Sequence, residues 1–134
     1  MNRAKSREYL LQLVYQMEIT GDTPLETFNS FMEDNEDKKD NLDLEYIRLA
    51  LEGIKINKEV IDNKIKEQLV NWKLNRVSKV NLAILEIAVY EILFKEDIPE
   101  KVSINEAIEI CKKYSEDKSV AFINGVLDKI YKNI

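Results

Sequence analysis

The feature that most constrains the fold is a segment in the second half of the chain in which almost every side chain is apolar. Between residues 82 and 93 the sequence reads LAILEIAVYEIL, and only Glu86 and Glu91 are charged. A helix that is apolar nearly all the way round must be buried, because it has no polar face to turn to water. The segment from Arg76 onward therefore predicts a central helix, and its two glutamates either face a partner or make hydrogen bonds inside the protein.

The composition favours helices as the elements that surround this segment. The 134 residues include only two prolines and three glycines, and Leu, Ile, Lys and Glu dominate. With 45% hydrophobic residues, a chain of this length can bury a core without the help of a metal or a disulfide. We therefore predict an all-α fold, a compact single-domain bundle of about seven helices that spans residues 1–134.

Apolar periodicity and capping signals predict the other helices. The first runs from Arg3 to about Ile19 and ends near Gly21. The second opens at Thr23-Pro24-Leu25-Glu26, which combines a capping hydroxyl, a proline at the first helical position and a glutamate three residues after the cap. The remaining helices are expected at about 43–56, from an Asn57 cap to Trp72, from a second capping-box pattern at Ser103-Ile104-Asn105-Glu106, and from Asp117 or Ser119 onward.

The residue types present argue against catalysis. The chain has no histidine, and its three glycines are dispersed, so that no phosphate-binding loop is formed. Its one cysteine, Cys111, lies in an apolar helical pattern and is typical of a core thiol rather than a reactive one. We expect no catalytic residue and no cofactor.

An acidic stretch over residues 33–45 holds seven carboxylates against Lys38 and Lys39. It lacks the central glycine and the regular alternation of oxygen ligands of a calcium loop, so we expect a mobile loop and no metal site. No apolar run is long enough to span a bilayer, and the single cysteine fits a reducing compartment. These features predict a cytoplasmic protein without a membrane partner.

The distribution of charge leaves a nucleic-acid role open. The net charge of −5 argues against a general nucleic-acid binder, yet Arg3, Lys5 and Arg7 all fall within the first seven residues. Cations at the start of a helix oppose its dipole, so phosphate contact stands beside the simpler interpretation of a solvated helix start. Phe122 lies at the edge of an apolar stripe, so it can belong to the rim of the core or serve as a platform for base stacking. Trp72 can anchor the core or serve as a binding platform.

Several motifs in a fixed order carry a family resemblance. The first helix contains Leu-Gln-Leu-Val-Tyr ending at Tyr15, and the middle of the chain contains Trp-Lys-Leu-Asn-Arg ending at Arg76 and then Ile84 to Glu91. The last third contains Val-Ser-Ile-Asn-Glu-Ala and Phe-Ile-Asn-Gly-Val-Leu-Asp, at 102–107 and 122–128. With these motifs the chain resembles the NusB family of bacterial transcription antitermination factors over nearly its full length.

The resemblance implies a function and a set of partners. Such proteins are small all-α domains that pair with the small-subunit ribosomal protein NusE, and the heterodimer binds the boxA element of nascent ribosomal RNA transcripts. The complex joins RNA polymerase with other Nus factors and suppresses premature termination. Carried over by motif, the implied RNA-binding residues are Arg3, Lys5, Arg7, Tyr15, Phe122, Asn124 and Asp128, and the implied NusE-facing residues are Arg76, Asn81 and Glu86.

Two other functional classes remain open beside this one. The chain can be a NusB-like helical protein-interaction module with little RNA binding, or a homodimeric structural protein. It also departs from the family pattern: Ala4 stands where relatives often carry arginine, Leu82 and Glu86 replace commonly basic residues, and Asn81 replaces an acidic one.

Overall fold

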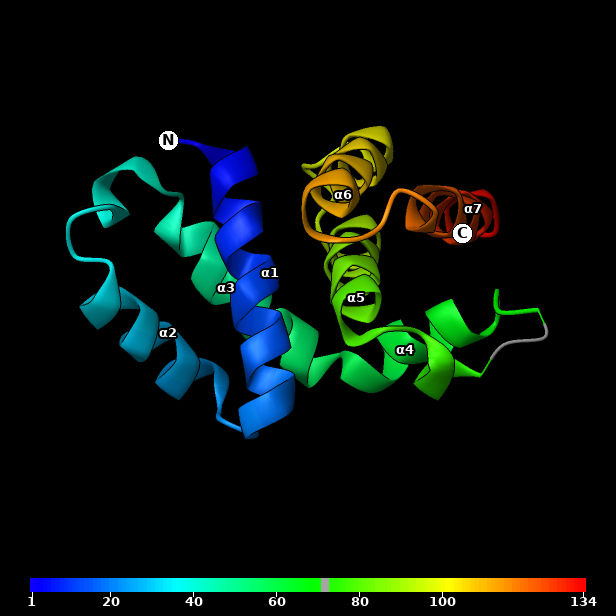
Figure 1. Cartoon of the computed structure of the whole chain (residues 1–134). Helices are drawn as coiled ribbons and strands as arrows, with labels where there is room; N and C mark the ends of the chain where they lie inside the picture. Colours follow the sequence, from blue (N-terminus) through cyan, green and yellow to red (C-terminus); the bar gives the residue numbers. More distant parts are fainter. Residues whose placement is uncertain (71–72) are drawn as a thin grey trace. The chain divides into compact units, whose positions relative to one another are not determined.

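The computed structural model describes residues 1–70 and 73–134, and within these ranges it contains seven α-helices and no β-strand (Figure 1). The prediction of an all-α fold with about seven helices is confirmed. The described residues group into two compact units, Met1–Ile56 and Asn57–Ile134. The proposed roles of Trp72 concern a residue that lies outside the described ranges.

The first unit holds helices α1 (Arg3–Thr20), α2 (Pro24–Asp34) and α3 (Leu44–Ile56), with a short 3-10 turn, η1 (Lys39–Asn41), before α3. Helix α3 packs against both α1 and α2. The capping box of α2 is present: the amide of Thr23 donates to Glu26 Oε1 at 2.9 Å, and the amide of Glu26 donates to Thr23 Oγ1 at 3.1 Å. The core of the first unit is built from apolar side chains of all three helices, among them Leu10, Val14, Phe31, Ile47 and Leu51.

The second unit holds α4 (Lys58–Lys66), η2 (Leu74–Arg76), α5 (Lys79–Phe94), α6 (Glu100–Tyr114) and α7 (Ser119–Lys132). Helix α5 packs against α4, α6 and α7, and eleven of its residues are buried. In Figure 1, α5, α6 and α7 are seen nearly end-on, whereas α4 runs across the view. The apolar segment is thus the central helix of its unit, as its sequence predicts.

Two of the predicted helix boundaries are wrong. Helix α4 ends at Lys66 instead of continuing to Trp72, and the side chain of Asn57 makes no capping hydrogen bond. Helix α6 begins at Glu100, after Pro99, instead of at Ser103. The Ser103 hydroxyl does not cap, because it is buried and donates a 2.8 Å hydrogen bond to Glu91 Oε1.

The acidic stretch over residues 33–45 is only partly irregular, since it includes the end of α2, all of η1 and the start of α3. No group of histidine, cysteine or acidic side chains among the described residues could hold a metal ion. None of the helices in the described part of the chain combines the length and apolar character that a membrane span needs.

Gly21 and Gly125 should respond to alanine with opposite signs. Gly21 ends α1 with φ of 77°, where an L-residue is strained, so Gly21→Ala should lower the free energy of unfolding by about 1 kcal/mol. Gly125 lies inside α7, and an added Cβ would meet no atom within 4 Å, so Gly125→Ala should raise it by about 0.5–1 kcal/mol. Urea denaturation of the two variants checks this pair, and equal shifts in one direction would contradict it.

Candidate nucleic-acid interface

The three N-terminal cations lie in the first two turns of α1, but the structure gives them different surroundings. Arg3 is half-buried and binds Asp43 Oδ2 through Nη2 at 2.8 Å and Nε at 2.9 Å. Arg7 is only 4% exposed, and its guanidinium lies 5.5 Å from the centre of the Tyr46 ring. Lys5 is exposed, with its ammonium 3.6 Å from Glu8 Oε1. Of the three, Arg7 is the enclosed one, whereas the side chains of Arg3 and Lys5 are 40% and 45% exposed and each is paired with a carboxylate.

Asp43 is the residue that orders this end of the first unit. Its Oδ1 accepts the amide of Tyr46 at 3.1 Å and so caps α3, while its own amide donates to Ser6 Oγ at 2.8 Å. The Ser6 hydroxyl in turn donates to the carbonyl of Asn2 at 2.7 Å. A carboxylate suits the positive end of α3, and it also offsets the charge of Arg3 at the start of α1. Asp43 thereby joins the first turns of two helices and fixes Arg3 between them.

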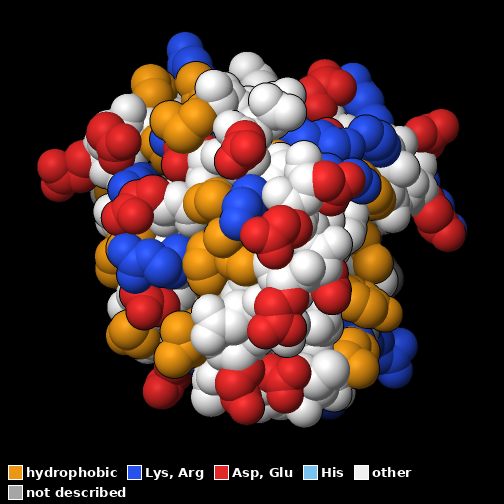
Figure 2. Space-filling view, turned by 90° about the vertical axis from the view of Figure 1, so that its left-hand side faces the viewer, with side chains coloured by type: hydrophobic (Ala, Val, Ile, Leu, Met, Phe, Trp, Pro, Cys, Tyr) orange, Lys and Arg blue, Asp and Glu red, His pale blue; other side chains and the backbone are white. Residues whose placement is uncertain are grey.

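Aromatic rings accompany these cations. The Arg3 guanidinium lies 4.6 Å from the centre of the Tyr46 ring, a distance at which a cation and the face of a ring attract each other. Tyr15 lies further along α1 and is 39% exposed, so that part of its ring is available for stacking. The face of the molecule shown in Figure 2 carries acidic and basic side chains intermingled with hydrophobic ones, without a broad field of one sign.

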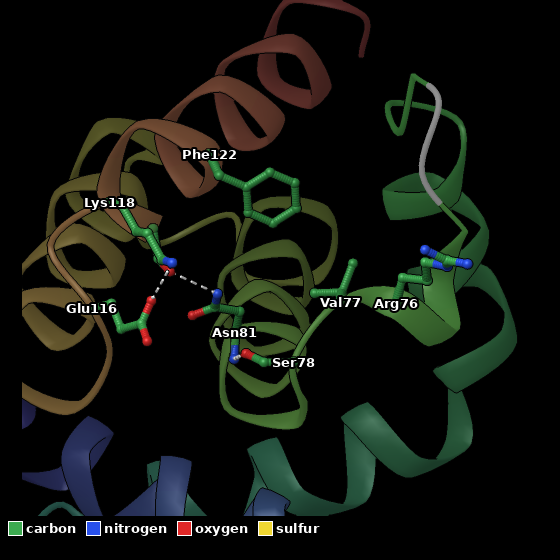
Figure 3. A pocket seen from close by; sticks show the side chains of 8 residues that line it. Arg76, Val77, Ser78, Asn81, Glu116, Lys118 and Phe122 are labelled. Carbon is green, nitrogen blue, oxygen red and sulfur yellow. Dashed lines mark hydrogen bonds and ion pairs between the residues drawn. The ribbon is translucent and has the colours of Figure 1, made fainter.

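In the second unit, a pocket of about 490 Å³ brings together three of the residues named from the sequence, Arg76, Asn81 and Phe122. Val77 and Ser78 also line it, and Glu116, Lys118 and Ser119 border it from the start of α7 and the residues before it. Figure 3 shows the Phe122 ring pointing into the pocket, with Asn81 on the side of Lys118 and Val77 on the side of Arg76, while the Arg76 side chain extends away from its centre. The resemblance stated from the motifs assigned these three residues to two separate surfaces, and the structure places them around one cavity.

Both polar atoms of the Asn81 side chain form hydrogen bonds that hold it in place. Its Nδ2 donates to Ser119 Oγ at 3.0 Å, and its Oδ1 accepts from Ser115 Oγ at 2.7 Å. Its backbone amide donates to Ser78 Oγ, the cap of α5, at 3.1 Å. Because Asn81 is only 9% exposed, it forms part of the wall of the pocket rather than a protruding contact.

Sequence reasoning missed the serines and Lys118. The position of Ser78 immediately before the central helix was a capping signal that could have pointed to it. Ser119 was expected only as a possible helix start, and no local pattern marked Ser115 or Lys118, because their roles depend on α5 and α7 lying side by side. The pocket therefore combines a ring, several hydroxyl groups and cations from segments distant in sequence.

The remaining predicted site residues lie outside this pocket. Asn124 is exposed, and it follows Phe122 by two residues, which places it on a different side of α7. Asp128 Oδ2 pairs with Lys132 Nζ at 2.9 Å. Glu86 is 4% exposed and pairs with Lys58 Nζ at 2.9 Å, so its carboxyl group is directed into the protein and a direct contact with a partner does not fit this arrangement.

The one cysteine offers no reactive group to the site. Cys111 is fully buried, and burial raises the pKa of its thiol, with a smaller opposing effect of a hydrogen bond with Ser115. A raised pKa disfavours the nucleophilic thiolate. The expectation of a core thiol agrees with this placement.

The sequence matches known proteins over nearly its whole length. The family model described as the NusB family matches residues 4–132. A Transcription antitermination protein NusB of Clostridium perfringens is 72% identical over all of this chain and 99% of that protein. The chain belongs to the NusB family.

Solved structures of this family have the same fold. T. maritima NusB is 38% identical, with a TM-score of 0.84 over 98% of this chain and 92% of that chain. The NusB-like chain of a crystal structure of antitermination factors NusB and NusE in complex with dsRNA is 25% identical, with a TM-score of 0.86 over 98% and 96%. The resemblance of this NusB family member, stated from its motifs, is confirmed.

Asp43 offers a test of how the N-terminal residues are positioned. Asp43→Ala removes both the cap of α3 and the partner of Arg3, and should lower the free energy of unfolding by about 1–3 kcal/mol. Asp43→Asn keeps an oxygen for the cap and loses only the charge, so it should cost less than half as much. Equal losses in urea denaturation would show that the capping bond contributes little.

Proposed function

We propose that this NusB family member is a transcription antitermination factor that binds boxA RNA of nascent ribosomal RNA transcripts together with ribosomal protein NusE. The observation that carries the proposal is the 72% identity, over its entire length, to a protein named Transcription antitermination protein NusB. A structural neighbour that carries NusE and RNA in one crystal supports the same pair of partners. The complex would act on RNA polymerase with other Nus factors.

The pocket of the second unit suits an unpaired nucleotide. Phe122 offers a partly exposed ring, and a base stacked on an aromatic side chain gains about 1–3 kcal/mol. Arg76 and Lys118 are exposed at its border and can approach phosphate oxygens, while the Ser78 and Ser119 hydroxyls can exchange hydrogen bonds with a base or a ribose. Arg76 is also the exposed member of the predicted NusE-facing residues, whereas Asn81 and Glu86 are buried.

The first unit would contribute separate contacts. Lys5 supplies an exposed cation and Tyr15 an exposed ring, whereas Arg3 can reach RNA only at the edge of its pair with Asp43. We assign Arg7, which is buried against Tyr46, the role of positioning this surface rather than of touching RNA. Asn124 and Asp128 would make peripheral contacts on α7.

The protein would act by binding rather than catalysis, and in the cytoplasm, where transcripts are made. The lack of histidine supports the first statement, because the usual proton-transfer side chain is missing. With a net charge of −5, the chain alone would bind RNA weakly and in a salt-dependent manner, so that NusE supplies much of the affinity.

One observation favours the alternative of a protein-interaction module with little RNA binding. Of the three N-terminal cations, Arg7 is buried and Arg3 is paired with Asp43, which leaves less positive charge for RNA than the sequence suggests. In that case the exposed residues of the pocket would contact protein alone.

Fluorescence anisotropy of a boxA RNA, titrated with the protein and NusE, tests the proposal. Phe122→Ala should weaken binding about 5- to 150-fold, the loss of one stacking contact of about 1–3 kcal/mol. Phe94→Ala is a matched control, since Phe94 is a partly exposed aromatic residue at the other end of the unit's central helix and does not line the pocket. A scrambled RNA measures sequence preference.

One result would count against the RNA role, and another against the pocket as the RNA contact. If boxA and scrambled RNA bind equally weakly with NusE present, the interaction-module alternative is favoured. If Phe122→Ala and Phe94→Ala behave alike while boxA is still preferred, the function stands and the pocket is not the RNA contact.

A further inference from the structure

A cluster of three charged side chains joins α4 to α5 away from the pocket. Lys58 Nζ lies 2.9 Å from Glu86 Oε2 and 3.1 Å from Asp62 Oδ2. Because both oxygens contact the same nitrogen, at 2.9 and 3.1 Å, Asp62 Oδ2 and Glu86 Oε2 lie no more than 6.0 Å apart. One ammonium group thus faces two carboxyl groups in a largely buried place.

The hydrogen bonds of this cluster are incomplete if both carboxyl groups are ionised. Asp62 Oδ1 is buried and has no hydrogen-bond donor. A buried acceptor without a donor is costly, and two carboxylates cannot hydrogen-bond to each other because neither carries a hydrogen. A proton on Glu86 removes both problems, since a protonated carboxyl group donates to a neighbouring carboxylate.

The charge of the cluster leads to the same conclusion. With both carboxyl groups ionised, the cluster carries one net negative charge, and Glu86 is only 4% exposed. Two like charges at close range in a buried site favour binding of a proton by one of them. With one proton bound, the cluster is neutral and Lys58 is balanced by a single carboxylate.

We propose that Asp62 and Glu86 share one proton beneath Lys58, and that loss of this proton as the pH rises weakens the packing of α4 against α5. The cluster would therefore make the contact between α4 and α5 in the second unit sensitive to pH. It concerns neither the pocket nor the N-terminal cations, and it stands whether or not the protein binds RNA.

The acid–base properties of the two partners support this arrangement. Burial, followed by the hydrogen bond and charge of Asp62, raises the pKa of Glu86 from an ordinary 4.5 to about 8, although Lys58 acts in the opposite direction. Burial by itself would lower the pKa of Lys58, but Glu86 and then Asp62 raise it, so Lys58 stays charged. The two charged groups that act on Glu86, Lys58 and Asp62, both come from α4.

The direction of the pH effect follows from these values. Between pH 4.5 and about 8 the folded protein holds a proton on Glu86 that the unfolded chain has released. The stabilisation is therefore complete below the unfolded pKa and is lost as the pH rises through the folded one. In this window the unfolding equilibrium constant should increase up to about tenfold per pH unit on account of this group.

Carbon-13 NMR of the side-chain carboxyl groups in the full chain tests the proposal directly. The Glu86 carboxyl carbon should titrate near pH 8 in the wild type and at a lower pH in Asp62→Asn, where the neighbouring charge is gone. A midpoint near 4.5 in the wild type, or one that Asp62→Asn leaves unchanged, overturns the proposal.

Urea denaturation between pH 5 and 8.5 gives a second, independent measurement. Glu86→Gln keeps a donor for Asp62 Oδ1 at every pH, so it should fold, lose most of the pH dependence of stability in this range and exceed the wild type at pH 8.5. Glu96→Gln, at an exposed position just after α5, is the matched control and should keep the wild-type dependence. The proposal fails if Glu86→Gln retains that dependence as well.

Discussion

A helix that is buried on all sides must find a partner inside the protein for every polar side chain that it carries. Helix α5 carries three such buried side chains, and each is held by a different neighbour. Asn81 is bound by Ser115 and Ser119 around the start of α7, Glu86 by Lys58 of α4, and Glu91 by Ser103 of α6. Apolar packing alone would allow α4, α6 and α7 to slide along α5, whereas these hydrogen bonds fix the register of each helix. The polar residues of an apolar helix thus specify how the second unit is assembled.

The same interactions place the pocket. The side-chain amide of Asn81 binds Ser119, and Phe122 follows Ser119 by about one helical turn. The hydrogen bond that joins α5 to α7 therefore also positions the Phe122 ring in the pocket. A binding surface positioned by buried hydrogen bonds on two helices requires little ordering when a ligand arrives. The structural role of Asn81 and the binding role proposed for Phe122 are therefore linked, although the residues are far apart in sequence.

The sequence was sufficient for features whose physical cause is local. The capping box of α2, the end of α1 at Gly21 and the central position of α5 all follow from neighbouring residues or from one helix's own composition. The pattern at Ser103 predicted the wrong start for α6. A serine followed three residues later by a glutamate occurs both at a helix start and inside the first turns of a helix, and the sequence does not distinguish the two cases. The true role of Ser103 depends on Glu91, which belongs to another helix. The burial of Arg7 was missed for the same reason, since Tyr46 contacts it from a distant part of the chain.

These contacts also change how the charge of the chain should be counted. The family resemblance gives Arg3, Lys5 and Arg7 the same RNA-binding role, but Asp43 neutralises Arg3 and the surroundings of Tyr46 enclose Arg7. Lys118 likewise lies 3.2 Å from Glu116, so an approaching phosphate must compete with a carboxylate for it. Because the salt dependence of RNA binding follows the number of phosphates that cations neutralise, a chain with so many internally paired cations gains less from electrostatics than its lysine and arginine content suggests. The binding energy that it supplies itself must come largely from stacking on rings such as Phe122, and the additional positive charge must come from its partner.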